Sequence, residues 1–353
     1  MFEQQGRSAD AEAAWQLYLK THPSSSEAFA HLGLLEARQE HYREAVPLYQ
    51  KALALRSTIP GLRLDLGLAF FKTGEMREAL EQFSVALKST PPSSPDRPRL
   101  TILMGMCHYG LGEYAKAVPY LRKAAGDDPQ NAELRLALAH SCLWSKQYQC
   151  VLDTYHEILM LNAESAEADM LAGEALDEMK DVNGAIQQFR DAVKTDPRMP
   201  DVHFGLGYLF WTKRQYPEAA AELQAELDNN PTHAQALTYL GDCELKLGHP
   251  DAAAPLLEKA IRVDSAIELA HLDLGSIDAD AGRPQEAERE LMAAARLAPN
   301  DVNVHWHLAR LYRSMGKQDQ ARAEFDKARN ITQAADAALI DKLTPHPAAA
   351  PEK

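Results

Sequence analysis

The sequence lacks the features that mark several protein classes. Its 353 residues include only 4 cysteines and no CxxC pair, which excludes a disulfide framework. No apolar run approaches the roughly 18 residues of a membrane-spanning helix. The start of the chain has no basic stretch followed by an apolar one, so we expect no signal peptide in this chain.

Basic residues are also in deficit. The chain has 37 lysines and arginines against 51 aspartates and glutamates, which gives a net charge of −14. A protein needs a basic surface to bind nucleic acid or an anionic membrane. Neither is therefore expected as the main partner. With 46% hydrophobic residues the chain can form a core. We expect a soluble protein of the cytoplasm or periplasm, with the compartment left open.

A repeating pattern is what the sequence does contain. Aligned at a period of 34 residues from Ser26, the chain gives nine full repeats, with four extra residues before the third. In every repeat the eighth position is small, the twentieth is alanine or valine, and the twenty-fourth is large and apolar. Glycine recurs at the middle of the repeat, at Gly74, Gly112, Gly248, Gly282 and Gly316.

This pattern resembles the tetratricopeptide repeat over roughly residues 1–335. The resemblance implies an all-α fold, a right-handed α-solenoid in which each repeat is a helix, a turn and a second helix. Small residues at the eighth and twentieth positions would let the paired helices approach closely. The large residue at the twenty-fourth position would fill the gap between neighbouring repeats. One repeat cannot bury its own faces, so stability is a sum over neighbours.

The ends and the insertion divide the chain further. Residues 1–25 are expected to form an N-terminal half repeat or capping helix, and residues 26–335 the nine repeats. A Pro/Ser-rich loop is expected at 89–98, and a C-terminal cap with a disordered Pro/Ala tail at 336–353. Two interpretations of the start remain open: a lone capping helix over 8–21, or the second half of a repeat that begins upstream in a longer protein.

No constellation of residues points to catalysis. The motifs HExxH, GxSxG, Walker A and GxGxxG do not occur. There are 13 histidines, but three fill one repeat position, which favours a structural role over metal binding. Cys142 and Cys150 flank the turn of the fourth repeat, where a redox pair is the alternative to separate thiols. We expect no enzyme activity, no cofactor and no metal.

In the family that this chain resembles, the first helices line a concave groove where ligands bind. The groove positions are the second, fifth, sixth, ninth, twelfth and thirteenth of each repeat, and here they are rich in aromatic and acidic residues. The expected partner-binding residues are Tyr109, Trp144, Met170, Glu174, Asp177, Glu178, Phe204, Tyr208, Trp211, Tyr239, Asp242 and Trp306. A solvated acidic face without a partner is the alternative.

The leading functional interpretation is a non-catalytic protein-interaction scaffold. Its partner would be a protein or peptide with basic and apolar residues, and self-association is also compatible with such grooves. One alternative is the recognition arm of a larger enzyme or of a secretion or assembly machine whose working domain lies outside this chain. Another is a chaperone-like holder of unfolded clients. Nucleic acid and direct membrane insertion are not expected.

Overall fold

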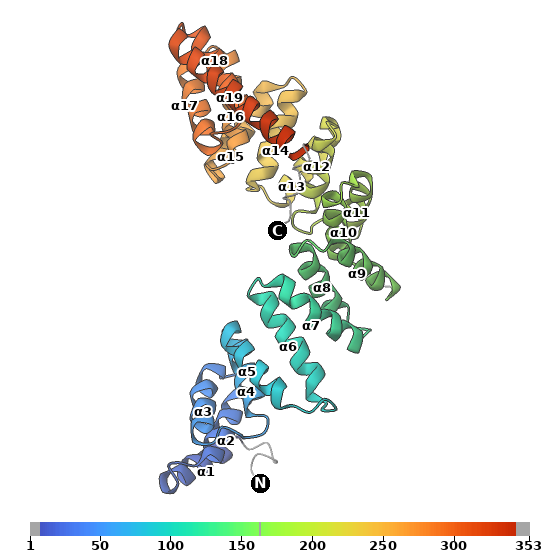
Figure 1. The fold of residues 1–353 in the computed structure, drawn as a ribbon, viewed down its shortest axis with the longest axis vertical. Coiled ribbons are helices and arrows are strands. Elements are labelled where there is room, and N and C mark those ends of the chain that lie inside the picture. The colour runs from blue at the N-terminus through green and yellow to red at the C-terminus, as the bar shows by residue number, and fades with distance from the viewer. Residues whose placement is uncertain (1–7, 162–163, 344–353) are drawn as a thin grey trace, which may run out of the picture. The chain divides into compact units, whose positions relative to one another are not determined.

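The computed structural model describes residues 8–161 and 164–343, and over these ranges it is all-α, with 19 helices packed as successive pairs. The chain divides into two compact units, Met1–Gln188 and Phe189–Lys353, called unit 1 and unit 2 below (Figure 1). The first residues of the expected half repeat, 1–7, and the expected tail from residue 344 lie outside the described residues.

Unit 1 begins with α1 (Ser8–Thr21), which covers the range expected for a capping helix. The first helices of its repeats are α2 (Ser26–Arg38), α4 (Leu62–Thr73), α6 (Asp96–Gly110), α8 (Ala132–Trp144) and α10 (Ala166–Glu178). The second helices are α3 (Tyr42–Leu55), α5 (Met76–Ser89), α7 (Tyr114–Asp127), α9 (Tyr148–Met160) and α11 (Val182–Thr195). The boundary between the two units falls within α11. The loop expected at 89–98 is shorter, because α6 already begins at Asp96.

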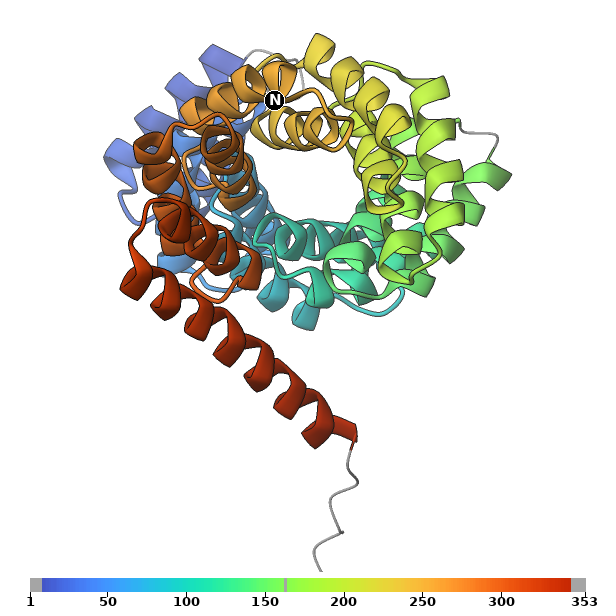
Figure 2. The ribbon, with the colours of Figure 1, turned by 90° about the horizontal axis from the view of Figure 1, so that it is seen from above.

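Unit 2 repeats the same arrangement. Its first helices are α12 (Val202–Thr212), α14 (Ala234–Lys246), α16 (Glu268–Asp280) and α18 (Val302–Ser314). Its second helices are α13 (Tyr216–Asn229), α15 (Pro250–Val263), α17 (Pro284–Leu297) and α19 (Gln318–Leu343). Figure 2 shows α19, in red, continuing past the helices against which it packs. The residues expected as a C-terminal cap are the end of this helix and do not start a new one.

One backbone turn closes every helix pair. The residue at the fifteenth position of the repeat has a positive φ in all nine repeats, and in five of them it is the glycine seen in the sequence. Gly74 has φ 85°, and its N–H reaches the carbonyl oxygens of Phe70 and Phe71 at the end of α4. The other four repeats adopt the same turn with Glu40, Lys146, Lys180 and Arg214. Since a side chain with a Cβ is disfavoured there, the repeat packing determines the turn even without glycine.

The paired helices approach closely because a small residue faces a large one. A Cβ added to Gly67 would lie 2.5 Å from Phe83 Cε1, and one added to Gly241 would lie 2.7 Å from Leu257 Cδ2. These are the eighth and twenty-fourth positions of the same repeat. The expectation that the large residue fills the gap between repeats is therefore incomplete, because it first covers the glycine of its own repeat. Phe189 also reaches the next repeat, where it lies against Gly205.

Within each unit, first helices of successive pairs contact one another at several places. The contacts join α2 to α4, α6 to α8 and α8 to α10 in unit 1, and α12 to α14, α14 to α16 and α16 to α18 in unit 2. Side chains on these helices from neighbouring repeats can therefore converge on one site.

Two further features bear on the expectations from sequence. Cys142 and Cys150 form a disulfide between α8 and α9, which is the paired alternative, while Cys107 and Cys243 are free and buried. Within the described part of the chain, no helix is both long and apolar enough to cross a membrane.

Substitution of Gly67 by alanine tests the close approach. The added Cβ cannot be accommodated without moving the ring of Phe83, so we expect G67A to lower the free energy of unfolding by about 1–3 kcal/mol. Gly126 in α7 has no atom within 4 Å of the position of a Cβ, so G126A should raise that free energy by up to about 1 kcal/mol. Urea unfolding of both variants measures the difference, and equal stabilities would contradict the account.

Candidate functional site

The residues predicted for the groove all lie on first helices, in two groups that belong to different units. In unit 1 they are Tyr109 on α6, Trp144 on α8, and Met170, Glu174, Asp177 and Glu178 on α10. In unit 2 they are Phe204, Tyr208 and Trp211 on α12, Tyr239 and Asp242 on α14, and Trp306 on α18.

In unit 1, an exposed tryptophan ends a short run of aromatic rings. Trp144 is 65% exposed, and its ring stacks on that of Tyr114 with centroids 6.0 Å apart. Tyr114 packs edge-on against Tyr109, at 5.7 Å. Tyr114 begins α7, a second helix, so the pattern of groove positions on the first helices could not indicate it.

The predicted residues of α10 are less exposed than this tryptophan. Met170, Glu174 and Asp177 are half-buried, and Glu178 is exposed. The hydroxyl of Tyr148 donates a hydrogen bond to Glu178 Oε2 at 3.4 Å. Among the residues predicted for the groove of unit 1, Trp144 therefore presents the most exposed apolar side chain to a partner.

In unit 2, four of the predicted aromatic residues form one cluster. The rings of Tyr208 and Trp211 are 5.9 Å apart and stacked, and Tyr239 packs edge-on against both, at 5.4 and 4.8 Å. Phe204 completes the cluster, 6.0 Å from Tyr239. All four side chains are half-buried, so each keeps part of its ring accessible. We call Phe204, Tyr208, Trp211 and Tyr239 the aromatic cluster.

A buried carboxylate lies beside the aromatic cluster. Asp242 is 1% exposed, and Trp211 Nε1 donates a hydrogen bond to its Oδ2 at 2.6 Å. Lys246 Nζ lies 3.3 Å from Asp242 Oδ1, one turn further along α14. Burial of a charged carboxylate is costly unless it is paired, and these two donors supply the pairing.

Next to Asp242 a pocket of about 640 Å³ opens between the first helices of unit 2. Its apolar lining includes Trp211, Leu245, Leu269 and Leu272. Its polar lining includes Asp242, Lys246, Asp273, Ser276 and His307. Ligand pockets are commonly roughly 300–1,000 Å³ in volume, and they combine an apolar lining with a few polar groups. The pocket has the size and the lining of a ligand site.

Asp273, on α16, is the polar group of this pocket that lacks a full set of partners. It is 5% exposed, and its Oδ2 has no hydrogen-bond partner. Burial raises the pKa of the Asp273 carboxyl well above its usual range, and the neighbouring Asp242 raises it further, while Lys246 lowers it in part. The groove analysis of the sequence did not select Asp273. The sequence feature that could have identified Asp273 is its carboxyl group at the sixth position of the repeat, where most repeats have an uncharged residue.

The last first helix, α18, reaches the pocket through His307 and Asn303 rather than through the predicted Trp306. His307 Nδ1 lies 2.7 Å from Ser276 Oγ, and burial together with the charge of Arg310 lowers the pKa of His307, so this imidazole is neutral at neutral pH. Trp306 is 43% exposed, with the Arg310 guanidinium 4.6 Å from the centre of its ring.

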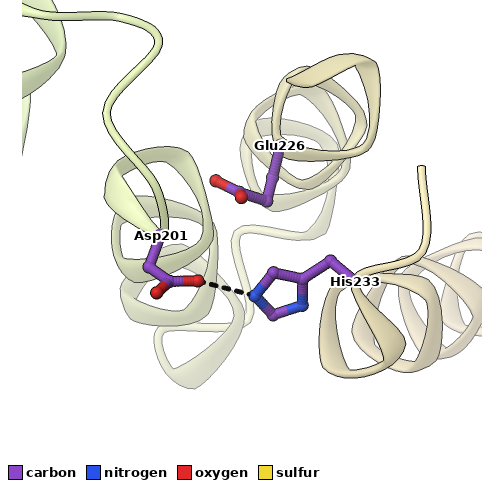
Figure 3. Close-up of side chains that lie close together, drawn as sticks. All are labelled: Asp201, Glu226 and His233. Carbon is purple, nitrogen blue, oxygen red and sulfur yellow. Dashed lines mark hydrogen bonds and ion pairs between the residues drawn. The ribbon is translucent and has the colours of Figure 1, made fainter. Parts of the chain in front are cut away.

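Over residues 8–161 and 164–343, one group of side chains is close enough together to hold a metal ion. Asp201, Glu226 and His233 each offer a ligand atom, and these atoms lie within 4.8 Å of one another (Figure 3). Glu226 is 1% exposed and stands where most repeats have alanine. Its Oε2 accepts a hydrogen bond from the backbone N–H of Phe204, in the first turn of α12.

The hydrogen bonds of His233 favour a structural role for this group. His233 Nδ1 accepts a hydrogen bond from the backbone N–H of Ala236 and so caps the start of α14. A neutral imidazole that accepts at Nδ1 carries its proton on Nε2, which donates to Asp201 Oδ1 at 2.8 Å. A metal ion at Nε2 would move that proton to Nδ1 and break the cap. Glu226 is therefore explained by its bond to the first turn of α12, and Asp201 by its bond to His233.

Comparison with protein families gives matches along most of the chain. A family model described as "Tetratricopeptide repeat" matches residues 2–60, 31–98, 64–132, 170–233, 204–266 and 272–338. A second model with the same description matches residues 108–175.

Curated proteins with similar sequences are distant relatives. Anaphase-promoting complex subunit 3 of Schizosaccharomyces pombe is 21% identical over 302 residues, which are 85% of this chain and 44% of that protein. TPR repeat-containing protein YpiA of Bacillus subtilis is 20% identical over 287 residues, 79% of this chain and 67% of that protein. This chain thus spans less than half the length of the first of these relatives.

Similar solved structures cover about half of the chain. YrrB, described as a TPR protein with an unusual peptide-binding site, is 21% identical, with a TM-score of 0.44 over 54% of this chain and 98% of that one. MamA is 21% identical, with a TM-score of 0.42 over 47% of this chain and 96% of that one.

Two substitutions of His233 distinguish a capping residue from a metal ligand. H233A removes the acceptor at the start of α14 and should lower the free energy of unfolding by about 0.5–2 kcal/mol. H233N keeps an acceptor at the cap and should stay close to the unsubstituted protein. Thermal unfolding with and without zinc chloride measures both effects. A zinc-dependent rise in melting temperature that either substitution abolishes would contradict the capping role.

Proposed function

Because the chain belongs to the tetratricopeptide repeat family, we propose that it is a non-catalytic scaffold that holds a peptide segment of a partner protein on the first helices of unit 2. Proteins of this family generally serve as protein-interaction scaffolds. The observation that carries the proposal is the aromatic cluster beside the pocket, where half-exposed rings from α12 and α14 adjoin buried carboxyl groups.

The chemistry of this surface favours a peptide over other ligands. Tryptophan and tyrosine dominate the binding energy of protein interfaces, because they bury a large area at a low cost in conformational entropy. The hydrogen bond between Trp211 and Asp242 fixes the indole before a partner arrives, which reduces the entropy lost on binding. The partner segment would place apolar residues on the aromatic cluster and a hydrogen-bond donor in the pocket.

The exposed ring of Trp144 gives unit 1 a second, smaller candidate surface. With the acidic residues of α10, it would serve as an additional contact for the same partner or for another one. The proposal is compatible with a role of this chain as the recognition arm of a larger assembly. When one partner segment is bound on one surface, the effective concentration of a linked second segment at the other surface is raised.

Peptides selected from a random library against the unsubstituted protein provide a defined probe of this function. Loss of a hot-spot aromatic ring costs about 2 kcal/mol or more of binding free energy. We therefore expect Y208A and W211A to raise the Kd of the selected peptides at least tenfold. Fluorescence anisotropy with labelled peptides measures the Kd.

Met292 supplies the control, because it is 44% exposed on α17, a second helix of the same unit. M292A should leave the Kd unchanged. Circular dichroism of Y208A and W211A should retain the helical signal of the unsubstituted protein. Selected peptides that bind Y208A and W211A as tightly as the unsubstituted protein would show that the aromatic cluster is not the binding surface.

A further inference from the structure

The unpartnered oxygen of Asp273 is the least satisfied feature of the pocket in unit 2. A buried acceptor without a hydrogen bond costs about 1–3 kcal/mol, and folded proteins retain few of them. Asp273 is 5% exposed, lines the pocket, and has no hydrogen-bond partner at Oδ2. A donor that arrives from outside the chain would remove this cost.

Another repeat of the chain has an aspartate at the same position as Asp273, and a nearby arginine accompanies it. Asp65 occupies the sixth position of the second repeat, as Asp273 does in the eighth. Burial raises the pKa of Asp65, and the positive charge of Arg99, at the second position of the next repeat, lowers it in part. In the corresponding place after Asp273 the chain has Asn303, which lines the pocket without supplying a charge. The guanidinium found near Asp65 is thus missing near Asp273.

The charged groups around Asp273 do not replace that guanidinium. On α14, Lys246 Nζ is engaged by Asp242 Oδ1, 3.3 Å away. On α16, Glu268 adds a second carboxyl group whose buried Oε1 also lacks a partner. On α18, His307 is hydrogen-bonded to Ser276 and is neutral. Arg214, which follows α12, lines the pocket but is exposed. Of the charged residues that line the pocket, the carboxyl groups of Asp242 and Asp273 are buried, whereas the cations Lys246 and Arg214 are exposed.

We propose that the pocket binds the side chain of an arginine in the partner segment, with its guanidinium donating to Asp273 Oδ2 and its plane lying against the indole of Trp211. This inference rests on the proposed peptide-binding function and names the residue that the pocket selects. A guanidinium suits the site better than an ammonium, because it is planar, stacks on aromatic rings and presents several donors in fixed directions.

Binding changes the protonation of the pocket in a defined way. Asp273 holds its proton to a higher pH than an ordinary carboxyl group, since burial and Asp242 both disfavour its charge. When the guanidinium enters, its positive charge favours the carboxylate, so binding lowers the pKa of Asp273, and a proton that the carboxyl group holds at the pH of binding passes to the solvent. No covalent bond forms or breaks apart from this proton transfer.

A small probe isolates the pocket from the rest of the groove. We use Nα-acetyl-arginine N-methylamide, and its citrulline counterpart as a neutral analogue of the same shape. The chain has four tryptophans, so the indole N–H signal of Trp211 is assigned in an NMR spectrum by its loss in W211F. We expect the arginine probe to shift this signal saturably, and the citrulline probe to bind at least tenfold more weakly.

Two substitutions act on the pocket in different ways. D273N removes the acceptor charge, and N303R supplies an internal guanidinium at the position that Arg99 occupies relative to Asp65. Both should weaken the arginine probe at least tenfold, while D251N, on the exposed start of α15, should leave its binding unchanged. Equal binding of the two probes, or unchanged arginine binding in both D273N and N303R, would overturn the proposal.

The library peptides separate this inference from the proposed function. If W211A weakens the selected peptides but D273N, N303R and replacement of each peptide arginine by citrulline do not, the scaffold function stands and the arginine pocket is wrong. If neither W211A nor Y208A weakens them, the proposed function itself fails.

Discussion

The fold depends on the contact between the eighth and twenty-fourth positions of each repeat. A residue without a side chain, or with only a methyl group, lets the second helix place a large apolar residue directly against the backbone of the first, as Phe83 does at Gly67. This contact sets the distance between the two helices of a pair. Because the first helices then contact one another from pair to pair, it also brings side chains of different repeats to the same place.

The pocket of unit 2 is a product of this spacing. Trp211, Asp242, Asp273 and His307 belong to four successive repeats, yet all four line one pocket. Close packing of the helices excludes water from their carboxyl groups, which is why the pKa of Asp273 is raised. The same packing that stabilises the fold therefore creates a site whose polar groups are incompletely satisfied. Functional sites commonly have this property, because the missing partner is the ligand.

Much of the fold could be predicted from the sequence, because the pattern of small and large residues recurs in every repeat and remains recognisable where a single repeat departs from it. The columns of small and large residues indicated the helix pairs, and the five turn glycines indicated where the first helices end. The turns at Glu40, Lys146, Lys180 and Arg214 carried no such signal, since there tertiary packing imposes a conformation that the residues do not prefer. Similarly, the four cysteines could not reveal that Cys142 and Cys150 are joined, because pairing depends on how α8 and α9 lie.

The candidate site was only partly predictable. Positions on the first helices indicated Trp211, Tyr239 and Asp242, because the helical period places them on one face. Asp273 was not selected, since its significance lies in what surrounds it: burial, a neighbouring carboxylate and a missing donor. Trp306 was selected from its position, but α18 reaches the pocket through other residues. Sequence position thus predicts which helix face a residue occupies. Whether a buried polar atom has a hydrogen-bond partner is seen only in the three-dimensional structure.

The most direct test of this account is the pKa of the Asp273 carboxyl group, measured by ¹³C NMR titration with the signal assigned by its loss in D273N. In the free protein, the account predicts a pKa well above the value of about 3.9 found for aspartate in peptides. Saturation with Nα-acetyl-arginine N-methylamide should lower it, because the bound guanidinium stabilises the carboxylate. An ordinary pKa in the free protein, or a raised pKa that the arginine probe leaves unchanged, would contradict the account.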